Sequence, residues 1–196
     1  MHWTVVLTHV ALVVVGAAGL SKLRRPRAAG VALCAAVGAP SLLRRSPWAV
    51  GAAVGSIELA VAVWAVSGGR GGWIALGSLY VLLAAAATRT TLLGAPDCGC
   101  HSRPAPPSWF QVALDAAFAA APLAAVASNA AMSPVATARD AGSVVAGAAY
   151  LGGVALLAAL VVAATGLLAE VRAGVSRVEE TRGSFKLAAG SMGMHR

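Results

Sequence analysis

The sequence predicts an all-α integral membrane protein, and three observations support this fold class. Of the 196 residues, 59% are hydrophobic and only 11% are charged, and the mean hydropathy is +0.78. Such a chain has too few polar side chains to cover itself in water, so lipid is its expected solvent. Five stretches are long and apolar enough to cross a bilayer. Four of them begin with a tryptophan, which is typical of indoles at membrane interfaces.

The expected spans follow from the rule that about 20 mostly apolar residues cross a hydrocarbon core roughly 30 Å thick. They are Trp3–Leu20, Trp48–Ser67, Trp73–Thr88, Trp109–Ser128 and Val144–Ala169. Pro122 is expected to kink the fourth span. We interpret residues 1–20 as a retained span rather than a signal peptide, because the basic residues follow the apolar run and no Ala-x-Ala-like site comes after it.

Residues 28–43 are apolar but are interrupted by Gly30, Gly38 and Pro40. A helix over residues 28–39 would rise only about 18 Å, which is too short to cross the bilayer. Basic residues flank the stretch on both sides, with Lys22, Arg24, Arg25 and Arg27 before it and Arg44 and Arg45 after it. The pattern predicts a half-helix or interfacial helix that returns to the face it left.

The chain is expected to form one membrane bundle over residues 1–128, a loop and a fifth span over 129–169, and a polar tail outside the bilayer over 170–196. The net charge of +8 does not indicate a nucleic-acid partner, because most basic residues lie at the ends of apolar segments. There they set topology and contact lipid headgroups. The expected location is a cell membrane crossed several times, the inner or plasma membrane of a bacterium.

The distribution of basic residues predicts the topology. With five spans, residues 21–47, 89–108 and 170–196 share one face and carry thirteen of the fifteen Lys and Arg residues. Only Arg70 and Arg139 lie on the other face. The positive-inside rule therefore places the 89–108 connection in the cytoplasm and the N-terminus outside.

The chemically distinctive feature of the chain is the tripeptide Cys98-Gly99-Cys100 in that connection. Two thiols separated by one residue can lie within disulfide distance, but the small ring restricts the geometry of the bond. Gly99 relaxes this restriction because it has no Cβ. Strained and exposed disulfides tend to be exchangeable rather than structural. The pair is therefore a candidate redox site, although two incidental cysteines would give the same sequence.

The neighbours of the pair bear on its chemistry. His101, Arg103 and the N-terminus of the following span favour thiolate, whereas Asp97 opposes it. Asp97 and His101, together with the two thiols, also offer mixed ligands for zinc or copper(I). The usual C-x-x-C spacing with a second ligand pair is absent, so we expect no metal site.

Ionisable residues inside the expected spans form a second group of candidates. Glu58 falls in the middle of the second span, where a carboxylate must be protonated, paired or directed into a polar cavity. A cluster of Glu58 with Lys22 or His9 is one possibility, and an interhelical hydrogen bond that only holds the bundle together is the other. For His9 and Asp115 a structural role, an interhelical hydrogen bond that holds the bundle together, is favoured. Cys34 lies in the apolar half-helix and is expected to act as a small apolar residue.

The order of these residues resembles the MauE family of methylamine utilisation proteins, which is close to the DoxX-like membrane proteins. The likeness covers residues 4–128. Its landmarks are Gly19-Leu20-Ser21-Lys22-Leu23, Glu58-Leu59-Ala60, Asp97-Cys98-Gly99-Cys100 and Ser108-Trp109. The resemblance implies a four-helix DoxX/MauE-like bundle with a half-helix after the first span, here with an extra C-terminal fifth span. It also implies a role in processing, transport or disulfide formation of a partner such as the small subunit of methylamine dehydrogenase, together with a thioredoxin-like protein.

The layout is also similar to that of vitamin K epoxide reductase proteins, in which a half-helix follows the first span and redox cysteines precede the fourth. That likeness implies a quinone as electron acceptor, although it concerns the fold alone. The chain departs from the MauE pattern after the second cysteine. The family usually has an aromatic residue and then glycine there, whereas this chain has His101 and Ser102. A protonatable group in this place would alter the redox behaviour of the thiols.

These observations predict a thiol-disulfide relay in which Cys98 and Cys100 exchange with a thioredoxin-like protein or a secreted client, and Cys100 is slightly favoured as the attacking thiol. His101, Lys22 and Glu58 are the expected supporting residues. Two alternatives stay open: an assembly factor or chaperone with a static disulfide, and a metal-handling or transport protein. A secreted client requires the pair on the extracytoplasmic face, in conflict with the charge rule, and the resemblance favours that face.

Overall fold

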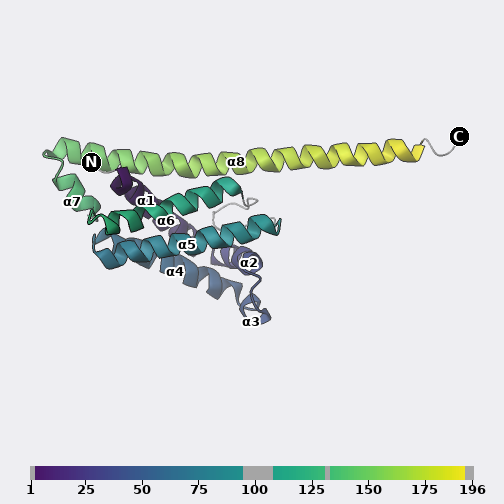
Figure 1. Ribbon diagram of the computed structural model, residues 1–196. Coiled ribbons are helices and arrows are strands. Elements are labelled where there is room, and N and C mark those ends of the chain that lie inside the picture. Colours follow the sequence, from purple (N-terminus) through teal and green to yellow (C-terminus); the bar gives the residue numbers. More distant parts are fainter. Residues whose placement is uncertain (1–2, 95–107, 131–132, 193–196) are drawn as a thin grey trace.

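The computed structural model describes residues 3–94, 108–130 and 133–192, and all regular secondary structure in these ranges is helical (Figure 1). The helices are α1 (Trp3–Arg24), α2 (Pro26–Ala36), α3 (Ser41–Arg44), α4 (Pro47–Val66), α5 (Arg70–Leu92), α6 (Trp109–Ala127), α7 (Pro134–Arg139) and α8 (Val144–Met192). Five of them, α1, α4, α5, α6 and the first part of α8, are long and apolar enough to span a membrane. The prediction of an all-helical, multi-pass membrane protein is thereby confirmed.

The stretch between the first two spans differs from the single half-helix expected over residues 28–43. It forms α2 and α3, separated by a turn at which Gly38 has a φ of +61°. A left-handed backbone favours glycine, and Pro40 cannot continue the preceding helix because its ring fixes φ and removes the N–H. α2 has eleven residues and rises about 16 Å, so it is too short to cross the bilayer.

Glycines allow α2 to lie directly against α4. A Cβ added to Gly30 would lie 1.7 Å from the carbonyl oxygen of Pro47, and one added to Gly51 would lie 1.9 Å from that of Pro26. No side chain can be accommodated at such distances, so the two backbones touch. Close approach through small residues is a general means of helix packing in membranes.

The core lies where α1, α4, α5, α6 and α8 meet. Tyr80 of α5 packs edge-to-face on Phe118 of α6 with ring centroids 5.3 Å apart, and its hydroxyl donates to the carbonyl oxygen of Ala11 on α1 at 2.8 Å. These contacts tie three helices together near the middle of the bundle. α6 continues through Pro122, which is fully buried.

The four tryptophans that begin the expected spans do not all behave as interfacial anchors. Trp3, Trp48 and Trp109 are exposed, as an indole at a membrane interface would be. Trp73 lies one turn inside α5, which begins at Arg70, and it is fully buried because its indole packs on His9 of α1. Its Nε1–H donates to the carbonyl oxygen of Ala65 at 3.2 Å. Trp73 therefore packs inside the bundle, unlike the other three tryptophans.

α8 is the element that departs furthest from expectation. It is a single helix of 49 residues, roughly 74 Å long, that packs on α1 and α7 and then runs past the ends of the other helices (Figure 1). Residues 170–192, expected as a polar tail, continue the helix of the fifth span. The stretch contains no proline, so nothing in the backbone ends the helix at the edge of the apolar segment.

Candidate functional site

The central feature of the bundle is a buried ion pair between Lys22 of α1 and Glu58 of α4. The ammonium nitrogen of Lys22 donates to both carboxylate oxygens of Glu58 at 2.9 Å. The two side chains are only 5% and 1% exposed. A charge inside a membrane protein is costly unless it is paired, and each partner here neutralises the other. The structure therefore pairs Glu58 with Lys22, one of the two partners suggested by the sequence.

Two glycines make room for this pair. A Cβ on Gly19 would lie 2.8 Å from the carbonyl oxygen of Gly55 and 3.1 Å from the Cβ of Glu58. A Cβ on Gly55 would lie 2.9 Å from the carbonyl oxygen of Gly19 and 3.1 Å from the Cβ of Lys22. The absence of side chains at these positions lets α1 and α4 approach until the ion pair can form across them.

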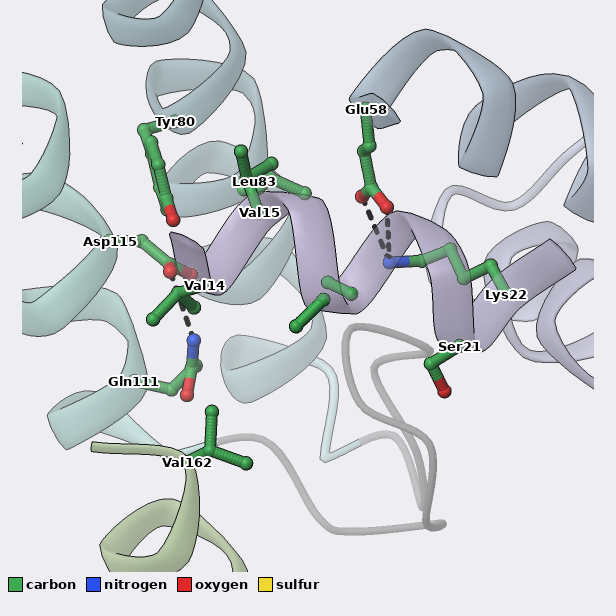
Figure 2. A pocket seen from close by; sticks show the side chains of 12 residues that line it. Val14, Val15, Ser21, Lys22, Glu58, Tyr80, Leu83, Gln111, Asp115 and Val162 are labelled. Atoms are coloured by element: carbon green, nitrogen blue, oxygen red, sulfur yellow. Dashed lines mark hydrogen bonds and ion pairs between the residues drawn. The ribbon is translucent and has the colours of Figure 1, made fainter. Parts of the chain in front are cut away.

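The pair lies at one end of a cavity of about 100 Å³ inside the bundle. Five helices line it, through Val14, Val15, Ala17, Ala18, Ser21 and Lys22 of α1, Glu58 of α4, Tyr80 and Leu83 of α5, Gln111 and Asp115 of α6, and Val162 of α8. Figure 2 shows the ion pair on one side and the Asp115 carboxyl with the Gln111 amide on the other, with Val15 and Leu83 between them. The cavity thus has two polar ends and an aliphatic middle.

The second polar end is built on α6. The Nε2–H of Gln111 donates to Oδ1 of Asp115 at 2.9 Å, one helical turn along. Asp115 is 3% exposed, and its Oδ2 has no hydrogen-bond partner among the described residues. The sequence placed Asp115 in a span and favoured a structural role. The structure places it on the wall of the cavity.

His9 belongs to a separate contact near the other end of α1. Its Nδ1 is hydrogen-bonded to the Tyr150 hydroxyl of α8, and its ring packs edge-on against Trp73 with centroids 5.7 Å apart. Along α1 it lies about 15 Å from Gly19, the level at which Glu58 approaches. The structure therefore does not bring His9 to Glu58, and His9 instead links α8 to α1 and α5.

The predicted redox residues Cys98 and Cys100, with the supporting His101, lie outside the described residues, in the connection between Gly94 and Ser108. The structure does describe where this connection rejoins the bundle. Ser108 caps α6 by accepting a hydrogen bond from the backbone N–H of Gln111 at 3.1 Å. Since Gln111 lines the cavity, the connection returns to the bundle one helical turn from the polar cavity.

Cys34 behaves as the sequence suggested for a small apolar residue. It is 4% exposed on α2, and its Sγ lies 3.8 Å from the carbonyl oxygen of Leu43, which corresponds to a weak thiol hydrogen bond. Its burial keeps it away from soluble thiols. Cys34 can therefore be replaced by alanine so that experiments report on the other two cysteines alone.

The metal ion and the quinone considered from the sequence can be compared with the cavity and its residues. In the described part of the chain, no three His, Cys, Asp or Glu side chains are grouped as a metal would need. The cavity of about 100 Å³ is smaller than an engineered cavity of about 150 Å³ that accepts benzene. The mechanism below rests on the cysteine pair and includes no step through a quinone.

Sequence reasoning assigned no site role to three of the polar lining residues, Tyr80, Gln111 and Ser21. For Gln111 a signal was available, because glutamine and aspartate at i and i+4 on one helix are a recognised hydrogen-bonding pair. Tyr80 and Ser21 carry no such signal, since their position on the cavity depends on how α1, α5 and α6 pack.

The comparisons with known proteins found no match. No protein-family model, curated protein or solved structure matches this chain. The resemblance to the MauE family therefore stays a prediction that rests on its sequence landmarks. The functional argument accordingly depends on the cysteine pair in the sequence and on the buried polar groups of α1, α4 and α6.

Proposed function

We propose that this protein is a membrane thiol-disulfide relay or maturation factor in which Cys98 and Cys100 are the exchanging residues. The observation that carries this proposal is the position of the Cys-Gly-Cys tripeptide, in a connection whose return to the bundle at Ser108 is one turn from the buried polar cavity. The proposal includes a bundle of the DoxX/MauE type in a bacterial cell membrane, with a thioredoxin-like partner and a secreted client.

The exchange follows ordinary thiol-disulfide chemistry. A client thiolate attacks the Cys98–Cys100 disulfide, forms a mixed disulfide with one cysteine and releases the other as a thiolate. A second client thiolate then attacks the mixed disulfide, which leaves the client oxidised and the Cys98–Cys100 pair reduced. A disulfide of the thioredoxin-like partner restores the pair by the same two steps in reverse. Each exchange transfers two electrons and two protons in total, and the disulfide of the thioredoxin-like partner is the oxidant that each cycle consumes.

The supporting residues have different roles in this scheme. His101, next to Cys100, would accept the thiol proton and so favour the attacking thiolate. Lys22 and Glu58 would act as positioning residues, since their ion pair fixes α1 against α4.

The test is to trap the mixed disulfide. With Cys34 replaced by alanine, Cys98→Ser and Cys100→Ser are expressed separately and membranes are quenched with acid and alkylated. We expect one of the two variants to accumulate a reductant-sensitive adduct with a client or a thioredoxin-like protein, because the resolving thiol is missing. The Cys98→Ser/Cys100→Ser double variant is the control and should give none. Absence of an adduct in both single variants would favour the alternative of an assembly factor with a static disulfide.

A further inference from the structure

Asp115 presents a buried oxygen that the described residues leave without a partner. Its Oδ1 accepts from Gln111, whereas its Oδ2 accepts no hydrogen bond in the described ranges. The side chain is 97% buried, as its exposed fraction is 3%. Leaving a buried carboxylate oxygen without a donor is costly, and such groups in native proteins commonly mark a bound water, ion or ligand.

The cavity beside Asp115 has room for such a ligand. Its volume of about 100 Å³ is several times the roughly 10–15 Å³ that one water molecule requires, and it is below the roughly 150 Å³ of a cavity that accepts benzene. Val15 and Leu83 lie between its polar ends, and Val14 lies beside Asp115 (Figure 2). The small side chains of Ala17 and Ala18 also line it. This wall suits a short carbon chain better than a cluster of water molecules.

The charges around the cavity decide which head group fits. Among the described lining residues, Lys22, Glu58 and Asp115 in their ordinary ionised forms sum to one negative charge, and the ammonium of Lys22 donates to both oxygens of Glu58. A ligand that carries one positive charge and an N–H donor would balance this charge and satisfy Oδ2 of Asp115. An anion would increase the imbalance, and a neutral alcohol would leave it in place.

We propose that the cavity binds a small primary ammonium ion with a short aliphatic chain, whose head group donates a hydrogen bond to Oδ2 of Asp115. The chain packs against Val14, Val15 and Leu83, and the far end of the cavity is closed by the Lys22–Glu58 pair. None of the described residues that line the cavity is a cysteine, so this proposal does not rest on the thiol relay.

Binding of n-propylammonium to the full-length protein in lipid nanodiscs tests the proposal by calorimetry. n-Propanol and propionate serve as matched ligands of similar size. Asp115→Asn keeps the shape of the side chain and removes its charge, and Asp140→Asn is the matched control at an exposed position. We expect n-propylammonium to bind the wild type and Asp140→Asn with the same affinity. Its affinity for Asp115→Asn should be about ten-fold or more lower, because this variant loses a charge-assisted hydrogen bond.

A second variant protects the test against misfolding of Asp115→Asn. Ala18→Leu fills the cavity without altering any charge and should also lose n-propylammonium binding. Equal binding of n-propanol, or unchanged affinity in Asp115→Asn, would overturn the proposal. An infrared carboxylic-acid band that Asp115→Asn removes, and that persists under saturating n-propylammonium, would also overturn it, because Asp115 would then be neutral. Cys98→Ser/Cys100→Ser should bind n-propylammonium like the wild type, so failure of the relay would not affect this result.

Discussion

Gly19 of α1 and Gly55 of α4 lie so close that a Cβ on either one would come within 2.9 Å of the other's carbonyl oxygen. The Lys22–Glu58 ion pair spans the same crossing. The backbone contact and the buried charges are thus parts of one arrangement, since the helices must touch before a lysine and a carboxylate separated by 36 residues can meet.

Alanine at Gly19 or Gly55 should push α1 away from α4 and weaken the ion pair. The added methyl group meets backbone oxygen, which cannot move aside, so we expect a loss of about 1–3 kcal/mol in the free energy of unfolding. This loss in the free energy of unfolding is measured by unfolding each variant in mixed detergent micelles through titration with a denaturing detergent. Gly152→Ala is the matched control, because nothing lies within 4 Å of its added Cβ. Equal stability of Gly19→Ala and Gly152→Ala would contradict the backbone contact.

Lys22 and Glu58 should show strong energetic coupling. Lys22→Met or Glu58→Leu alone breaks the buried ion pair, and we expect each to cost about 3–5 kcal/mol in the free energy of unfolding. The double variant removes both charges and should recover to within about 1 kcal/mol of the wild type, because apolar pairs often replace buried ion pairs at little cost. The same detergent titration gives the double-mutant cycle. Additive losses in the double variant would mean that the two residues do not act as a pair.

The sequence was sufficient for those parts of the fold that depend on local composition. The apolar runs located all five long helices, because a span is defined by its own length and hydropathy. Gly38 and Pro40 also indicated that the segment after the first span is broken, although not that it forms two helices. Glu58 was recognised as a candidate because a carboxylate within an apolar run is conspicuous in any arrangement.

Features that depend on packing between distant helices could not be predicted in this way. The choice of Lys22 rather than His9 as the partner of Glu58 follows from the crossing at Gly19 and Gly55, which the sequence does not specify. Trp73 is buried because its indole packs on His9 of α1 and donates to the carbonyl oxygen of Ala65 on α4, and these contacts depend on how the helices pack. That Oδ2 of Asp115 is buried without a hydrogen-bond donor among the described residues can likewise be recognised only once the packing of α6 against α1 and α5 is known.

The face of the membrane that carries Cys98 and Cys100 follows from the proposed client. Exchange with a secreted protein requires an extracytoplasmic pair, because the reducing cytosol keeps thiols reduced. In a Cys34→Ala background, we expect a membrane-impermeant maleimide to label the reduced pair on intact cells. Labelling only after the cells are permeabilised would place the pair in the cytoplasm, as the charge rule indicates, and would contradict a secreted client.

The central claim is that Cys98 and Cys100 cycle between dithiol and disulfide, and their redox state in growing cells tests it most directly. Cells that express the Cys34→Ala protein are quenched with acid, and free thiols are tagged with a maleimide of large mass, before and after brief pulses of diamide or dithiothreitol. We expect a mixture of tagged and untagged protein that shifts with each pulse and returns to its starting ratio after the pulse is removed. A pair that stays fully oxidised or fully reduced throughout would contradict the relay.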